Sequence, residues 1–165
     1  MGIVSSFTTA DLQALTTAIP AIVEEEIIRA LSYLGEQCVI RIRDRSGLDS
    51  WFDQTGNLRS SIGYVVYKNG ITMVESDFKQ VKDGSDGVSS GKKAVIDLAT
   101  KYSDNSYALI ILAGMEYAEY VEAMEKKDVL ASTEIWARSK VNGLFDNALQ
   151  RAKKRIEKLM TQLGL

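Results

Sequence analysis

The segment WFDQTGNLRSSIGYVVYKNGITMVESDF, residues 51–78, decides the fold of this chain. Asn69-Gly70 is the dipeptide most typical of a two-residue hairpin turn, because both positions of that turn need a positive φ. Two runs rich in β-branched and aromatic residues flank it, Leu58–Tyr67 and Ile71–Ser76. The segment therefore predicts two antiparallel strands joined by a tight turn. A turn cluster at residues 54–57, in which Gly56 supplies the unusual backbone conformation, precedes the first strand.

Helices are expected before the hairpin. Thr8 can cap a short helix that has Asp11 in its first turn and ends near Ala18. Pro20 fits the first position of a second helix, Ala21–Arg43. Three glutamates near the start of this second helix, residues 24–26, suit its dipole. Its apolar residues recur at steps of three and four, which predicts one face on a core. They are Val23, Ile27, Leu31, Leu34 and Cys38.

The chain after the hairpin alternates between polar and apolar segments. Residues 79–93 are polar and rich in glycine, which favours a flexible loop. Tyr107–Ala113 is a continuous apolar run of strand length and predicts a central buried strand. The other expected elements are a short helix at Ala94–Tyr102, a helix at Met115–Lys126, a short strand at Asp128–Ser132 and a long helix from Glu134 to about Leu163, capped by Ser132 or Thr133.

This order of elements predicts an α+β fold with a small, mainly antiparallel sheet covered by the two long helices. The length of 165 residues suits a single domain with one core, interrupted by the flexible loop at residues 79–93.

The composition excludes several classes of function. The chain has no histidine, which removes the commonest general base and the commonest metal ligand. Its single cysteine, Cys38, lies on the apolar stripe of a helix and is expected to be a core residue. No apolar run is long enough to span a membrane. We expect no catalytic residue, no cofactor and no metal site; an enzyme would have to use carboxylates such as Asp49 and Asp53, or Tyr117 and Tyr120.

Two motifs carry a family resemblance. The first is QTGNLRSSI, residues 54–62, which follows a long helix, and the second is YAEYVE, residues 117–122. In this order they resemble the tail-completion, or head–tail joining, proteins of long-tailed bacteriophages and prophages. The resemblance covers roughly residues 20–160. The chain departs from the family pattern after the second motif, where residues 123–127 read AMEKK in place of a Phe-Gly-Thr turn and a Pro-Phe segment.

The resemblance implies a structural virion protein without catalysis. Such a protein forms a ring of its own copies, a hexamer being one candidate, around a channel through which DNA passes without specific binding. Its other partners are the neck connector and the tail-tube or terminator proteins. Its place is the head–tail interface of the virion, and the bacterial cytoplasm during assembly. Exposed edges of a small sheet suit ring formation.

Six residues in and before the first motif are candidates for subunit contacts. They are Trp51, Phe52, Thr55, Gly56, Leu58 and Arg59. The aromatic pair Trp51-Phe52 has two interpretations that the sequence does not separate. It either closes one end of the sheet or anchors a neighbouring subunit.

The alternative function is a nucleic-acid-binding or regulatory module. Residues 134–165 carry seven basic and three acidic residues, a net charge of +4, whereas residues 1–133 carry a net charge of −6. The basic candidates on the last helix are Arg151, Lys153, Lys154, Arg155 and Lys158. The helix dipole explains part of this clustering, and a phosphate backbone or an acidic partner would explain the rest.

Overall fold

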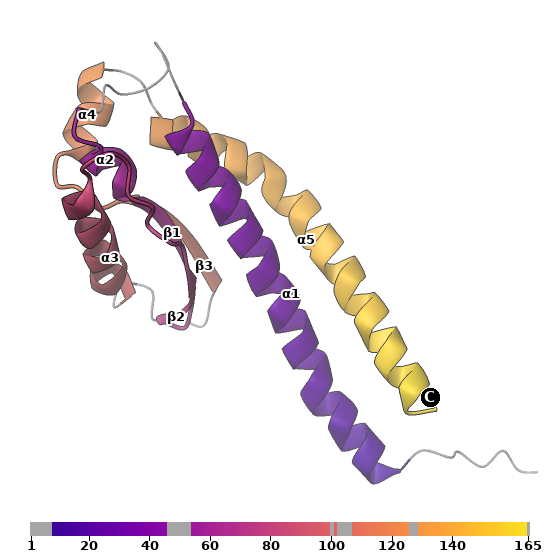
Figure 1. Cartoon of the computed structure of the whole chain (residues 1–165). Coiled ribbons are helices and arrows are strands. Elements are labelled where there is room, and N and C mark those ends of the chain that lie inside the picture. Colours follow the sequence, from indigo (N-terminus) through magenta and orange to yellow (C-terminus); the bar gives the residue numbers. More distant parts are fainter. Residues whose placement is uncertain (1–7, 46–53, 100, 102–106, 126–128, 165) are drawn as a thin grey trace, which may run out of the picture. The chain divides into compact units, whose positions relative to one another are not determined.

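The computed structural model describes residues 8–45, 54–99, 101, 107–125 and 129–164. In chain order its elements are α1 (Thr9–Arg43), α2 (Asn57–Ser60), β1 (Ile62–Lys68), β2 (Ile71–Glu75), α3 (Ser85–Ala99), β3 (Tyr107–Ala113), α4 (Ala118–Glu125) and α5 (Val129–Gln162) (Figure 1). The three strands form one antiparallel sheet. The predicted α+β class, with two long helices and a small antiparallel sheet, is confirmed.

The described residues form two compact units. One comprises the beginning of α1 up to Ala30 and the end of α5 from Asn142, which run side by side in opposite directions (Figure 1). The other, Leu31–Val141, holds the sheet and the remaining helices. Whether the chain is a single domain stays a prediction. Among the described residues, no helix has both the length and the apolar character needed to cross a membrane.

The hairpin follows the prediction from its turn. Asn69 and Gly70 have φ angles of 54° and 76°, the pair of positive values that Asn-Gly favours, and β1 pairs with β2 across them. The first strand is shorter than expected, however, because residues 57–60 form the helical turn α2. The strand order is β2-β1-β3, so β1 lies in the centre and the first six of its seven residues are buried.

The expectation for the third strand is half wrong. β3 has the predicted bounds, but it is an edge strand, and Leu112 is its one buried residue. A continuous apolar run indicates that both faces of a strand meet apolar neighbours. It does not indicate whether both edges of the strand are hydrogen-bonded to other strands. Here β1 takes the central position because it is bonded to β2 on one side and to β3 on the other.

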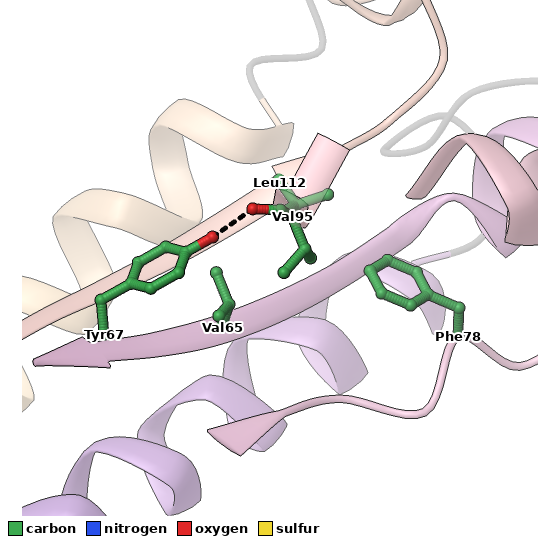
Figure 2. Close-up of a cluster of buried hydrophobic side chains, with 5 residues drawn as sticks. All are labelled: Val65, Tyr67, Phe78, Val95 and Leu112. Atoms are coloured by element: carbon green, nitrogen blue, oxygen red, sulfur yellow. Dashed lines mark hydrogen bonds between the residues drawn. The ribbon is translucent and has the colours of Figure 1, made fainter. Parts of the chain in front are cut away.

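Helix α3 covers one face of this sheet. Figure 2 shows the cluster beneath it: Val65 and Tyr67 from β1, Leu112 from β3, Val95 from α3, and Phe78. The Tyr67 hydroxyl donates a hydrogen bond to the Val95 carbonyl, which satisfies the polar tip of a buried ring. The opposite face contacts α1. Gly35 lies so close to the Tyr64 ring that a Cβ on it would come within 2.4 Å of that ring.

The flexible loop expected at residues 79–93 is wrong over most of its length, because α3 begins at Ser85 and not at Ala94. The glycines of this segment have a packing role. Gly87 and Gly91 are buried in α3, and a Cβ on Gly87 would lie 2.0 Å from the Asn57 carbonyl oxygen of α2. Glycine lowers helix propensity, but here it lets two backbones touch, and that contact outweighs the local preference.

The two helices expected before the hairpin are one helix, with Pro20 in its interior. The predicted cap at Thr8 is confirmed, since the Asp11 carboxylate accepts from the Thr8 amide at 2.7 Å and the Asp11 amide donates to the Thr8 hydroxyl. Proline removes one helical hydrogen bond, at a cost of about 3 kcal/mol. The helix nevertheless continues without a break through Pro20 to Arg43. The glutamates at 24–26 therefore lie in mid-helix, away from the end of the dipole.

The start of the last helix also differs from the prediction. Residues 129–132 are helical, not a strand, and α5 begins five residues earlier than Glu134. The Glu122 carboxylate of α4 accepts the Leu130 amide at 2.7 Å and so caps α5. The hydroxyls of Ser132 and Thr133, which were expected to cap the helix, donate back to the Val129 carbonyl. A cap supplied from another helix leaves no local signal in the sequence.

Two buried groups make the unit Leu31–Val141 sensitive to alkali. Burial raises the pKa of the Cys38 thiol from 9.0 to about 11, and burial beside the negative charge of Glu36 raises that of Tyr64 from 10.0 to about 12. Above pH 9 the unfolded chain releases these protons first, so each group lowers the stability by at most about 1.4 kcal/mol per pH unit until it ionises in the folded state. We expect urea midpoints to fall from pH 9 upward. Tyr64→Phe should reduce the loss above pH 10, and an unchanged slope in this variant would contradict the assignment.

Candidate functional site

The first motif builds a tight junction between α2 and the segment before α3. Gly56 has a φ of 85°, in the left-handed region that favours glycine, as the sequence predicted. A Cβ at this position would also lie 1.9 Å from the Val81 carbonyl oxygen. Leu58 is buried, and the Ser60 hydroxyl accepts the Val81 amide at 2.7 Å. The motif is therefore a packing centre of the unit Leu31–Val141.

Two arginines connect this junction to the end of α1 by hydrogen bonds. The Arg59 guanidinium donates to the carbonyls of Arg43 and Arg45, the latter at 3.1 and 3.2 Å. The Arg43 guanidinium returns two bonds, to the carbonyls of Arg59 at 3.1 Å and Ile62 at 2.6 Å. The last carbonyls of a helix carry partial negative charge and lack partners within the helix, so a guanidinium suits them. This arginine clasp, Arg43 with Arg59, ties the end of α1 to the start of β1.

The clasp predicts that Arg59→Lys destabilises the chain by about 2 kcal/mol, because one ammonium group cannot reproduce the fork of donors that meets two carbonyls. Arg138→Lys is a matched control, since the Arg138–Glu134 ion pair is exposed on α5 and such pairs contribute about 0.5 kcal/mol or less. Urea denaturation followed by circular dichroism measures both variants. Equal midpoints for the two would show that the clasp is dispensable.

The structure places the interface candidates unequally. Thr55 is exposed, Gly56 and Leu58 are buried, and Arg59 donates inside the unit. Trp51 and Phe52 lie outside the described residues, as do Asp49 and Asp53. The contact role of these candidates stays a prediction, but the structure explains the motif residues from Gly56 to Arg59 by the fold alone.

Both outer edges of the sheet lack a strand partner among the described residues, since β1 lies between β2 and β3. On β2, the Ile71 side chain is 66% exposed. Beside β3 lies a groove of about 780 Å³, which we call the β3 groove. It is lined mainly by apolar residues of α1, β3 and α5, with two charged residues of α5 and Glu122 of α4. They include Leu31, Leu34, Leu109, Ile111, Leu130 and Val141.

The basic candidates of α5 are partly used within the unit of the paired helix ends. Arg151 donates to the Glu26 carboxylate at 2.6 Å, and Arg155 binds Glu25 and Glu26 at 2.6 and 3.1 Å. The Glu26 side chain is 4% exposed, and its pKa is lowered chiefly by the bond from Arg151. Lys153 lies 3.9 Å from Glu157 on the surface, and Lys154 and Lys158 are exposed.

Among the described residues, few side chains are arranged in a way that suggests catalysis or metal binding. No group of three metal-ligating side chains comes together among the described residues. Tyr117 and Tyr120 are exposed on the second motif, and the raised pKa of Cys38 keeps its thiol protonated at neutral pH. Sequence reasoning missed Glu26, Glu122 and the β3 groove, because each depends on residues brought together from distant segments.

The second motif, residues 117–122, contacts the beginning of the other long helix, α5. Residues 117–122 run into α4, and Glu122 at their end caps α5. The two motifs therefore lie at the end of α1 and at the start of α5. Comparison with known proteins identifies no family for this chain: no protein-family model, no curated protein and no solved structure matches it.

Proposed function

We propose that this chain is a structural virion protein of a phage or prophage, which joins the tail to the head connector by forming a ring of its own copies. The observation that carries the proposal is the three-stranded sheet, whose two outer strands lack a strand partner among the described residues. β3 reads YALIILA and contains neither a charged residue nor proline, which commonly protect a free edge, and β2 reads ITMVE, with a single charge at its last residue, Glu75. A chain with two such edges suits an assembly in which neighbours cover them.

The two motifs of the resemblance support the proposal by what they do. The first forms the arginine clasp at the end of α1, and the second supplies the cap at the start of α5. Both motifs therefore help to hold an end of a long helix in place, near the small sheet for α1 and beside α4 for α5. A resemblance confined to such positions concerns a shared architecture, and no step of a reaction depends on it.

The distribution of charge along the chain favours the head–tail joining role over the nucleic-acid-binding alternative. Residues 1–133 have a net charge of −6, which suits a channel wall along which DNA slides. Two of the five basic candidates, Arg151 and Arg155, are bound to glutamates of α1. That leaves a smaller cationic surface on α5 for a phosphate backbone than the sequence suggested.

Complementation in vitro tests the proposal. Heads and tails are collected from a phage or induced prophage that lacks this gene, and the purified chain is added. We expect infectious particles to appear in proportion to the added protein, because joining is a stoichiometric step. Heat-denatured protein is the control and should restore none.

A failure to restore infectivity with folded protein would contradict the joining role. Tight DNA binding by the purified chain, weakening steeply with salt and lost in a Lys154→Ala/Lys158→Ala variant, would favour the alternative instead. The joining role predicts no such binding.

A further inference from the structure

We propose that the β3 groove receives strand β2 of a second copy of this chain, so that the sheet continues from one subunit to the next. This inference deepens the proposed function and rests on it, because it names the two surfaces that meet in the ring. The occupant is a second copy, and the contact is heterologous: the β2 edge of one subunit meets the β3 edge of its neighbour.

The β3 groove lies where an added strand would place its side chains. Leu109 and Ile111 of β3 pair with Val66 and Tyr64 of β1, and Tyr64 lies against Gly35 of α1. Leu109 and Ile111 therefore face the α1 side of the sheet. The groove continues beyond them to Leu130 and Val141 of α5. A strand bonded to the free edge of β3 would direct every second side chain into this space.

Strand β2 carries side chains on the matching face. Ile71 pairs with Lys68 and Val74 pairs with Val66, so both lie on the same face of the sheet as Leu109. Ile71 is 66% exposed within its own subunit. If β2 of a neighbour continues the sheet at β3 with the same face toward the helices, its Ile71 and Val74 fall over the groove, because the alternation of side chains is kept across a sheet.

The polarity of the strands is consistent with a ring. β2 and β3 are both antiparallel to β1, so they run parallel to each other, and their contact between subunits is a parallel pair. Two different edges make a head-to-tail contact, which repeats around a ring. Pairing of β3 with a second β3 would instead close as a dimer and leave both β2 edges open.

One polar atom in the β3 groove also lacks a partner. Oε1 of Glu122 accepts the amides of Leu130 and Ala131, but its Oε2 is buried without a hydrogen-bond donor among the described residues. A buried acceptor without a donor is costly. An incoming strand brings a row of backbone amides, which are donors of the kind that this oxygen needs.

Cross-linking of the full chain tests this contact. Ile71→Cys and Leu109→Cys are combined in one chain and treated with a short bifunctional maleimide. A second pair, Ile71→Cys with Ile111→Cys, covers the next position on the same face. The native Cys38 is buried and its pKa is raised to about 11, so it should not react. We expect a ladder of covalent oligomers from a double variant, and no covalent product from any single variant.

Covalent dimers from Leu109→Cys alone would show pairing between two β3 edges and overturn the inference. If native mass spectrometry shows a closed oligomer but neither pair gives a ladder, the ring uses other surfaces: the inference fails and the proposed function stands. A monomer that still joins heads to tails overturns both the inference and the ring of the proposed function, and leaves only the joining role. A folded protein that neither assembles nor joins overturns both.

A charge variant keeps the test independent of cysteine chemistry. Ile71→Glu should convert the oligomer to monomer, because it places a carboxylate over a groove that is lined mainly by apolar side chains and by the carboxylate of Glu122. Ile96→Glu on α3 is the matched control, since Ile96 is 71% exposed and lies outside the proposed contact. Loss of assembly in both variants, or in neither, would contradict the assignment of β2.

Discussion

Gly87→Ala is expected to lower the free energy of unfolding by about 3 kcal/mol, because α3 and α2 touch through their backbones at this residue. A Cβ on Gly87 would lie 2.0 Å from the Asn57 carbonyl oxygen and 2.8 Å from its carbon. Both are main-chain atoms, which cannot rotate away as a side chain would. The helix therefore has to shift, and the shift disturbs the cluster of Val95 and Phe78 beneath it.

The matched control is the same substitution at Gly143. This residue lies in α5 and a Cβ on it would meet nothing within 4 Å. Alanine is a better helix former than glycine by about 1 kcal/mol, so Gly143→Ala should raise stability. Urea denaturation of the two variants should give shifts of opposite sign. A Gly87→Ala variant as stable as the wild type would show that the close approach of α2 and α3 is not required.

Replacing Arg151 and Arg155 together should lower the free energy of unfolding by more than replacing Glu26, the glutamate that both arginines bind. In Arg151→Met/Arg155→Met, the Glu26 carboxylate, which is 4% exposed in the wild type, loses both arginines that donate hydrogen bonds to it, and removing the partners of a buried charge costs about 3–5 kcal/mol. In Glu26→Gln the buried charge itself is gone, and the arginines, which are 41% and 44% exposed, return to water. The cost should then be about 1–2 kcal/mol.

Acid should remove the contribution of the Glu26 carboxylate to stability without a mutation. The pKa of Glu26 is lowered below 4.5 in the folded chain by Arg151, so this carboxylate stabilises the chain above pH 4.5. The contribution is lost as pH falls through the lowered folded pKa, where the folded carboxylate takes up its proton. Thermal unfolding at pH 7 and pH 3 checks both statements. A double arginine variant that is no less stable than Glu26→Gln would contradict the account of this ion pair.

Local patterns in the sequence predicted the elements whose causes are local. The turn Asn69-Gly70 needs two positive φ angles, and Thr8 with Asp11 forms a reciprocal cap; both lie within a few residues, and both are confirmed. The α+β class followed from the order of such elements. The left-handed conformation of Gly56 could be predicted for the same reason, because the requirement belongs to a single residue.

The errors concern contacts between distant segments. Glycines in residues 84–91 suggested a loop, but in the structure they allow α3 to touch the first motif. The ion pairs of Arg151 and Arg155 could not be foreseen for the same reason, because these arginines are more than 120 residues from the glutamates that bind them; the role of the basic residues toward a partner stays a prediction. The place of β3 at the edge of the sheet depends on pairing with β1, which the apolar run Tyr107–Ala113 does not encode.

The most direct test of the joining role is electron microscopy of lysates from a phage or induced prophage that lacks this gene. The account predicts DNA-filled heads beside separate, finished tails, and whole particles again when the gene is supplied in trans. Intact, infectious particles in the absence of the gene would contradict it.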